Sequence, residues 1–482
     1  MIEENRCSII IRGADVNSNE FKSFEKAFSV YNPVTHKYEY NIYTELNGNI
    51  YAPATITSSI VQTYFPSFTI VKNFANTPKA DTINFSMTHT PRTDIQETAL
   101  SFLKTIRNDK DNKNRMLNLA TGSGKTFVSI ALISYLKQKA MIVVDSIDLA
   151  AQWKHEILYH TDLTDDDILI MSGIEAVDLA KSNKNYKIFI AIHKTLNMIL
   201  SVDANGINDL IHKLKIGVRI FDECHTNFKS ICVINSLSNV NYTIFLTATP
   251  NRSDYKEDIL FSKVFKHVPS YDGNKIDNEK YHTVVLISFD SHPTSKQKAS
   301  VKTKYGFSLI KWANFLSENR LYENYIYSLN KIITSFGLID KNKKVAIMLP
   351  TIELINKTYD SLHAIYPQLE IGKFIGEIKK DKRSEELSKI FILTNQKIFG
   401  KGIDVPDLDC IINYVQLSSK VNLEQIIGRL RNNSKHDHVF IDVTDNGYYQ
   451  CRNQLKSRKR FYKKIAKKII EITEITNKEG NQ

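Results

Sequence analysis

The eight residues Leu119-Ala120-Thr121-Gly122-Ser123-Gly124-Lys125-Thr126 follow a short apolar run, 115–118, and precede a longer one, 127–133. The first run has the pattern of a strand and the second that of a buried helix. A strand, a glycine-containing loop, Gly-Lys-Thr and a helix indicate a phosphate-binding loop, because glycines let successive backbone N–H groups point at one anion. We expect Lys125 to reach the β- and γ-phosphates of a nucleotide, and the Thr126 hydroxyl to hold Mg²⁺.

This loop departs from the G-x-x-x-x-G-K-[ST] pattern at its first position, which is Leu119. A chance turn at the start of a helix is the alternative interpretation. The flanking strand and helix favour the phosphate site. The expected nucleotide contacts in the loop are Thr121, Gly122, Ser123, Gly124, Lys125 and Thr126.

Size and charge narrow the class of protein. The chain has 482 residues, enough for roughly three domains, and a net charge of +12. That charge favours a polyanionic partner such as nucleic acid, with a generally lysine-rich surface as the alternative. No run approaches the ~18 apolar residues of a membrane span. The five scattered cysteines form no C-x-x-C pair, so we expect neither a disulfide framework nor a zinc site, and a cytoplasmic, reducing location.

Alternating strand and helix patterns begin near residue 91. Runs such as 141–144 are apolar on both faces, as in a central parallel strand, so the pattern predicts a doubly wound α/β domain. A second α/β pattern starts near residue 336. We expect an N-terminal accessory module with possible nucleic-acid recognition in 1–90, a first α/β domain in 91–283, a connecting helical element in 284–335, a second α/β domain in 336–447, and a basic C-terminal helix and tail in 448–482.

A carboxylate pair follows one strand of the first domain. The run 218–221 ends in Asp222-Glu223-Cys224-His225. A carboxylate at the carboxyl end of a strand beside a phosphate loop can bind Mg²⁺ through water, which is the role expected of Asp222. Glu223 is then placed to orient or deprotonate the attacking water. The next strand ends in Thr247, whose hydroxyl can hydrogen-bond to Asp222 or His225.

The second α/β domain lacks a phosphate loop of its own. It carries Gly402-Ile403-Asp404-Val405-Pro406 after a strand, and Gln425-Ile426-Ile427-Gly428-Arg429-Leu430-Arg431 at the start of a helix. An arginine that faces another domain's phosphate loop can stabilise a transferring phosphoryl group. The alternative for these arginines is an ordinary basic helix face.

Together these residues resemble the DExH-type helicases and translocases of superfamily 2 over about residues 91–446. The resemblance is carried, in that family's order, by Arg92 and Gln96, 119–126 (motif I), 143–153 (Ia), 222–225 (II), 247–249 (III), 345–350 (IV), Thr394 with 402–406 (V), and 425–431 (VI). Within the superfamily the chain is most similar to phage UvsW-type and poxviral transcript-release helicases.

The resemblance implies two tandem RecA-like doubly wound parallel-sheet domains, with a small α+β N-terminal module and a basic C-terminal helix. It implies ATP and Mg²⁺ as cofactors, with Arg92, Gln96 and Asp404 among the nucleotide contacts. Gln425 and either Arg429 or Arg431 would supply the second half of the catalytic site. The choice of arginine stays open, because Asn432 occupies the usual place of the last arginine.

The leading functional hypothesis is an ATP-dependent DNA helicase or translocase that acts on duplex, forked or branched DNA. The alternatives are an RNA helicase or transcript-release ATPase of the same fold, and a non-catalytic nucleic-acid clamp or motor subunit. Replication or transcription proteins are possible partners, and no membrane is expected. The basic run 452–468 predicts an amphipathic helix whose cations contact phosphates, with a solvated face as the alternative.

Overall fold

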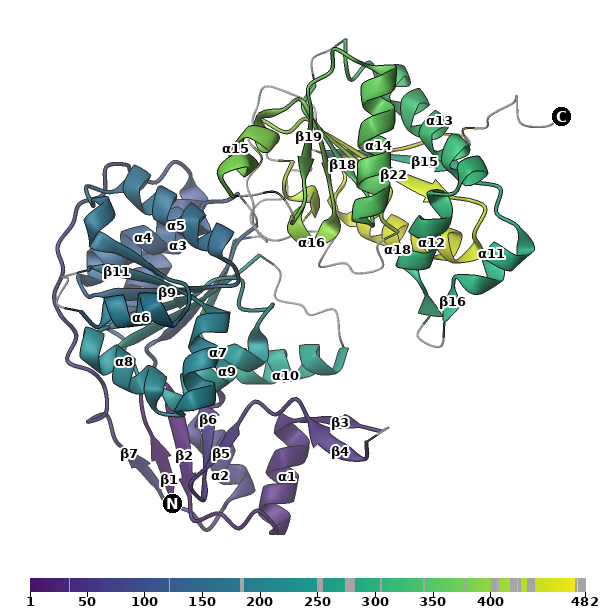
Figure 1. The fold of residues 1–482 in the computed structure, drawn as a ribbon. Helices are drawn as coiled ribbons and strands as arrows, with labels where there is room; N and C mark the ends of the chain where they lie inside the picture. The colour runs from purple at the N-terminus through teal and green to yellow at the C-terminus, as the bar shows by residue number, and fades with distance from the viewer. Residues whose placement is uncertain are drawn as a thin grey trace. The chain divides into compact units, whose positions relative to one another are not determined.

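The computed structural model divides the chain into two compact units, Met1–Asp277 and Asn278–Gln482 (Figure 1). The residues that it describes are 1–33, 35–120, 122–182, 186–248, 255–273, 282–303, 306–340, 343–376, 378, 380–399, 405, 407–416, 423, 426–430, 438–472 and 475. Each unit contains one large parallel sheet with helices around it.

The first unit is built on a seven-stranded sheet of order β10-β11-β9-β12-β13-β8-β14, in which every neighbouring pair is parallel. Its central strands β9 and β11 are fully buried because both faces are apolar, and β12 buries one charged residue, Arg219, which donates to Ser238 Oγ. The strands are β8 (Asn114–Asn118), β9 (Ala140–Val144), β10 (Ile168–Met171), β11 (Ile188–Ile192), β12 (Val218–Phe221), β13 (Tyr242–Thr247) and β14 (Ser270–Asp272).

Helices connect these strands, as in other doubly wound sheets. They are α3 (Asp94–Lys104), α4 (Lys125–Leu136), α5 (Ile147–His160), α6 (Ile174–Ala180), α7 (His193–Val202), α8 (Gly206–Leu214), α9 (Phe228–Leu237) and α10 (Tyr255–Phe265). Helix α4 is apolar on all sides and mostly buried, which matches its place against the middle of the sheet.

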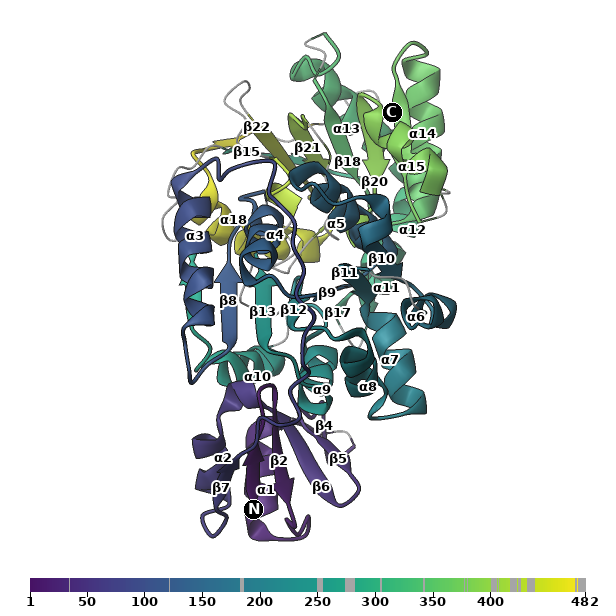
Figure 2. The same ribbon diagram turned by 90° about the vertical axis from the view of Figure 1, so that its left-hand side faces the viewer.

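A small α+β module precedes this sheet and packs on α9 and α10 (Figure 2). Its sheet has the order β5-β6-β2-β1-β7, with only β1 and β7 parallel. The Cys7 backbone N–H donates to Asn239 Oδ1 (3.0 Å), so the module is hydrogen-bonded to the first domain. Its elements are β1 (Ile2–Glu4), β2 (Ser8–Arg12), α1 (Asn19–Phe28), β3 (Val30–Asn32), β4 (Lys37–Glu39), β5 (Thr44–Leu46), β6 (Asn49–Pro53), α2 (Ser58–Tyr64) and β7 (Ile70–Lys72).

The second unit repeats the parallel arrangement in the order β19-β20-β18-β21-β22-β15-β23. Its strands are β15 (His282–Phe289), β18 (Val345–Met348), β19 (Ile371–Phe374), β20 (Phe391–Thr394), β21 (Cys410–Asn413), β22 (His438–Asp445) and β23 (Lys468–Glu471). Its helices are α11 (Ser295–Ser300), α12 (Leu309–Leu316), α13 (Asn319–Ser335), α14 (Ile352–Ile365), α15 (Lys380–Ser388), α16 (Gln396–Phe399) and α18 (Tyr449–Ile465), and a short hairpin joins β16 (Lys302–Thr303) to β17 (Gly306–Phe307).

The expected fold class, two tandem parallel-sheet α/β domains, is confirmed. The interpretation of 284–335 as a separate connecting element was wrong at its start, because β15 pairs along its whole length with β22 inside the second sheet. The polar composition of the surrounding segment hid this apolar strand. The C-terminal segment likewise adds β23 to the edge of the sheet, next to β15.

Two chemical features of the fold bear on its environment. All five cysteines are buried and none is disulfide-bonded. Within the described part of the chain, no helix combines the length and the apolar character needed to cross a membrane.

Candidate nucleotide site in the first unit

The phosphate loop joins β8 to α4 and depends on two glycines in the left-handed region of backbone space. Gly122 has φ 85° and Gly124 has φ 91°. Side chains with a Cβ rarely adopt such angles, so glycine is needed for the loop to turn back onto the helix. Helix α4 begins directly afterwards at Lys125, which leaves the positive end of its dipole at the loop. Thr121 lies outside the described residues.

Lys125 is held at this helix start by two oxygen atoms. Its Nζ donates to the Leu119 carbonyl (3.2 Å) and forms an ion pair with Glu223 Oε1 (3.3 Å). Only 10% of the lysine side chain is exposed. A cation fixed between a loop of N–H groups and a carboxylate suits a polyphosphate, since the ammonium can exchange one oxygen partner for another.

Asp222 follows β12 immediately and is fixed on both carboxylate oxygens. Its Oδ1 accepts from the Glu223 backbone N–H (2.9 Å), and its Oδ2 accepts from Trp153 Nε1 (2.8 Å). Trp153 comes from α5, so the contact joins two segments 69 residues apart. Nothing in the sequence around Trp153 indicates its hydrogen bond to the acid.

The two adjacent carboxylates titrate differently. Burial raises the pKa of Asp222 to about 6, and the neighbouring Glu223 charge adds to that effect. Burial also opposes ionisation of Glu223, but the charges of Lys125 and His225 outweigh it and lower its pKa. Glu223 is therefore ionised at neutral pH. Asp222 sits where a further cation would be stabilising, which fits a magnesium ligand.

His225 connects the acidic pair to the neighbouring strand. Its Nδ1 lies 2.9 Å from Thr247 Oγ1 at the end of β13 and 3.3 Å from Glu223 Oε2. The expected hydrogen bond from Thr247 is therefore made to His225. A change at the carboxylates can reach β13 through this contact. Thr249, the last residue of motif III, lies outside the described residues.

Gln96, expected upstream of the loop, braces it directly. Its Nε2 donates to the Ser123 carbonyl (3.4 Å), and its Oε1 accepts from the Arg92 backbone N–H (2.8 Å). A Cβ on Gly124 would lie 2.2 Å from Gln96 Nε2, so glycine is also needed for this close approach. The Arg92 side chain is exposed.

The second-unit candidates are described only in part. Arg429 lies in the short turn that follows residue 427 and is 4% exposed. Asp404, Gln425 and Arg431 lie outside the described residues. Their roles, and the choice between the two arginines, stay predictions.

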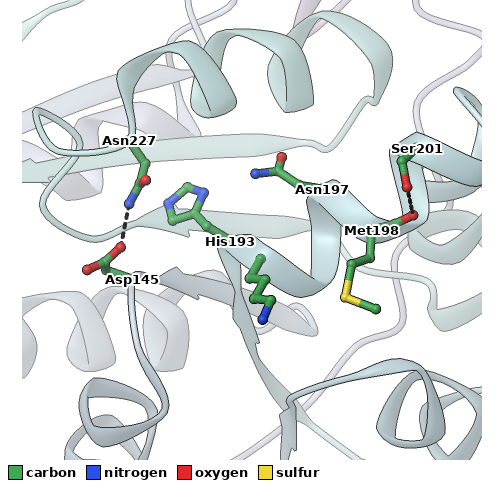
Figure 3. Close-up of a pocket in the computed structure, with 7 residues that line it drawn as sticks. Asp145, His193, Asn197, Met198, Ser201 and Asn227 are labelled. Atoms are coloured by element: carbon green, nitrogen blue, oxygen red, sulfur yellow. Dashed lines mark hydrogen bonds between the residues drawn. The ribbon is translucent and has the colours of Figure 1, made fainter. Parts of the chain in front are cut away.

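A pocket of about 390 Å³ lies at the carboxyl ends of β9 and β11 in the first unit (Figure 3). Asp145 follows β9 and accepts from Asn227 Nδ2 (2.9 Å), while His193 begins α7 directly after β11. His193 is 3% exposed, and burial lowers its pKa to about 4, against the opposing charge of Asp145. Sequence reasoning missed His193 and Asn227. For His193 the available signal was its position directly after an apolar strand, because ligands of parallel sheets bind at carboxyl ends.

Comparison with known proteins adds family information to this geometry. Residues 89–252 match the family described as "Type III restriction enzyme, res subunit", and residues 326–433 match "Helicase conserved C-terminal domain". The chain is 25% identical over 344 residues to "Transcript termination protein A18" of Yaba-like disease virus, covering 67% of this chain and 66% of that protein. It thus spans slightly under two thirds of that relative's length.

Two further similarities extend over most of the chain. It is 25% identical to "DNA 3'-5' translocase XPB2" of Sulfurisphaera tokodaii, covering 72% of this chain and 81% of that protein. The structure of S. cerevisiae Dbp5 bound to RNA and ADP BeF3 matches with a TM-score of 0.54 at 14% identity, covering 79% of this chain and 90% of that chain. At that identity the structural match supports the fold alone.

Proposed function

Since the chain belongs to superfamily 2, the ATP-hydrolysing helicases, we propose that it couples ATP hydrolysis to movement on, or remodelling of, duplex or branched DNA. The observation that carries the proposal is the assembly of Lys125 with Asp222 and Glu223, from two segments far apart in the chain, at one helix start. An inert nucleic-acid clamp would not need an ionised carboxylate beside the phosphate-binding lysine.

In this proposal the chain's residues divide the work at the nucleotide. The N–H groups of 122–124 and the Lys125 ammonium hold the phosphates. Thr126 and, through water, Asp222 would hold Mg²⁺, which when bound neutralises charge on the phosphates. Glu223, already ionised, orients the attacking water and accepts its proton. Gln425 and Arg429 or Arg431 would complete the site from the second unit.

Nucleic acid would cross the carboxyl ends of the first sheet, where the pocket of Figure 3 presents polar groups from three segments. Lys194 is exposed there and suits a backbone phosphate. Contacts of this kind carry little sequence preference and depend strongly on salt. The resemblance to a DNA translocase favours DNA as the substrate.

The second candidate is action on RNA or on a transcription complex. It is favoured by the similarity to a transcript termination protein and to a "Putative ATP-dependent RNA helicase" of Acanthamoeba polyphaga mimivirus. Both candidates use the same nucleotide site, so only the stimulating nucleic acid separates them. Replication proteins would be natural partners of the first candidate and transcription proteins of the second.

The test is the ATPase rate of the full chain with duplex DNA, forked DNA, single-stranded DNA and RNA. We expect duplex or forked DNA to stimulate most. Lys125→Ala should lower the stimulated rate by at least about a hundredfold, because the phosphates lose their principal cation. Lys266→Ala, at an exposed position of the same unit, is the matched control.

Three outcomes separate the hypotheses. Stimulation by RNA alone would exclude the DNA proposal and favour the second candidate. An unchanged rate in Lys125→Ala would show that the nucleotide site is wrongly placed. Absence of any ATPase, with nucleic-acid binding retained, would favour a clamp.

A further inference from the structure

Helix α18 divides a strongly basic segment into buried and exposed cations. The helix packs on β22 in the second unit, and its buried side chains are Cys451, Arg458, Phe461 and Tyr462. Arg458 is fully buried in an ion pair with Asp442 (2.8 Å). Lys459 is paired with Glu471 Oε2 on β23 (2.8 Å). These two cations therefore serve the fold.

Besides Lys464, four other cations of α18 are exposed, and these four share one face. They are Arg452, Lys456, Arg460 and Lys463, named here the α18 stripe. At about 100° per residue these positions fall within an arc of roughly 80°, and at 1.5 Å per residue they span roughly 16 Å. The Arg452 guanidinium also donates to the Asn446 carbonyl at the helix start, which holds that end of the stripe in place.

The segment that carries the α18 stripe is free of acidic residues. No aspartate or glutamate occurs between Asp445 and Glu471. Like charges at i and i+4, such as Lys456 and Arg460, destabilise a helix, and solvated surfaces ordinarily intersperse both signs. A merely solubilising face does not require four cations in one row with acids excluded from the whole segment.

The buried face explains why the α18 stripe is a fixed array. Arg458 also donates to Thr444 Oγ1 (3.0 Å), and the Tyr462 hydroxyl donates to Asp442 Oδ2 (2.9 Å). The helix is thus bonded to β22 at two positions one turn apart and cannot rotate its basic face inward. A straight, rigid row of cations complements a stiff polyanion better than a flexible one, because neither partner loses much conformational entropy.

We propose that the α18 stripe binds the phosphate backbone of duplex DNA, as a contact of the second unit that does not depend on ATP. Duplex DNA carries one charge per roughly 1.7 Å of axis, so a 16 Å row faces about five base pairs. The choice of DNA as the polyanion rests on the proposed function, whereas the stripe itself does not. The contact is to phosphates and carries no sequence preference.

The experiment compares two fourfold variants of the full chain that lose the same charge. One carries Arg452→Gln, Lys456→Gln, Arg460→Gln and Lys463→Gln. The control carries Lys296→Gln, Lys298→Gln, Lys302→Gln and Lys331→Gln, at exposed positions of the same unit. Fluorescence anisotropy with a labelled 20-base-pair duplex, without nucleotide, gives Kd at a series of KCl concentrations.

We expect the stripe variant to reduce the slope of log K against log[KCl] by about 2 to 3.6, since each lost phosphate contact removes roughly 0.9. Its Kd at 0.1 M KCl should rise at least tenfold, while the control changes less than twofold. A slope unchanged in the stripe variant, or reduced equally in both variants, overturns the proposal. Binding of the parent chain to duplex RNA but not to duplex DNA overturns the choice of polyanion.

The ATPase rate keeps this proposal separate from the proposed function. Measured without nucleic acid, that rate should be the same in the parent and both variants, because no residue of the stripe is among the proposed nucleotide contacts. If the chain has no ATPase activity but its DNA binding depends on the stripe, the stripe proposal stands and the proposed ATP-driven function is refuted. If DNA stimulates the ATPase but the slope of log K against log[KCl] is the same in the parent and the stripe variant, the proposed function stands and the stripe proposal is refuted.

Discussion

Replacing Arg458 by methionine tests whether this cation belongs to the core of the second unit, although it lies in a run of surface cations. The guanidinium is 0% exposed and bonds Asp442 through Nε (2.8 Å), Thr444 (3.0 Å) and Gln416 (3.3 Å). Methionine fills similar space but leaves Asp442 as a buried carboxylate without its cation. Removing one partner of a buried pair costs about 3–5 kcal/mol, so we expect the free energy of unfolding to fall by that amount.

The two tryptophans allow the unit to be followed separately. Trp153 lies in the first unit, and Trp312 is fully buried in the second, where its Nε1 donates to Asp445 (2.9 Å). Urea unfolding monitored by Trp312 fluorescence in a Trp153→Phe background should show the midpoint fall by about 1–2.5 M, for m of about 2–3 kcal/mol/M. Lys456→Met on the exposed face is the matched control and should shift the midpoint by less than about 0.3 M. Equal midpoints for both variants would refute the burial of Arg458 and with it the separation of the α18 stripe from the core.

Three further perturbations test the first unit. Gly124→Ala places a Cβ on a residue with φ 91° and against Gln96 Nε2. We expect the nucleotide affinity, measured by titration calorimetry, to fall at least tenfold with little change in the circular dichroism spectrum. An unchanged affinity would contradict the loop geometry. Trp153→Phe removes the indole N–H that donates to Asp222. The Mg²⁺ concentration that gives the half-maximal ATPase rate should therefore rise several-fold. An unaltered Mg²⁺ concentration would argue against that contact. Burial lowers the pKa of His193 from 6.5 to about 4, so the unfolded state takes up the proton first as the pH falls. The contribution of neutral His193 to the free energy of unfolding is therefore complete above pH 6.5. About 2 kcal/mol of that free energy is lost between pH 7.5 and 5. His193→Asn should flatten this pH dependence in urea titrations of the first unit, and equal slopes for parent and variant would refute the assignment.

The local pattern of the chain was enough to predict the parallel strands and the phosphate loop. The strand at 141–144 is apolar on both faces, which is the environment of a central parallel strand, so its place follows from the local pattern alone. Gly124 and Lys125 are likewise informative locally, because a left-handed glycine followed by a helix start is a property of a few consecutive residues.

Contacts between distant segments were decided by the tertiary structure. Trp153 meets Asp222 only because β9 and β12 are neighbours in the sheet, and β15 joins the second sheet only because β22 and β23 flank it. Neither partnership leaves a periodic signal in the sequence. The strand at 282–289 was missed because the polar residues around it dominated the segment.

The chain by itself predicts which residues perform nucleotide chemistry, since a phosphate loop and an acidic strand end are short-range patterns of residue type. It also determined the number of basic residues near its end. Only the tertiary structure decided which of these charges face solvent: Arg458 pairs with Asp442 in the core, whereas Arg460 two residues later is exposed. The physical reason is that burial of a charge depends on a partner supplied from another strand, and that partner is set by the packing of the sheet and not by the residues beside it in sequence.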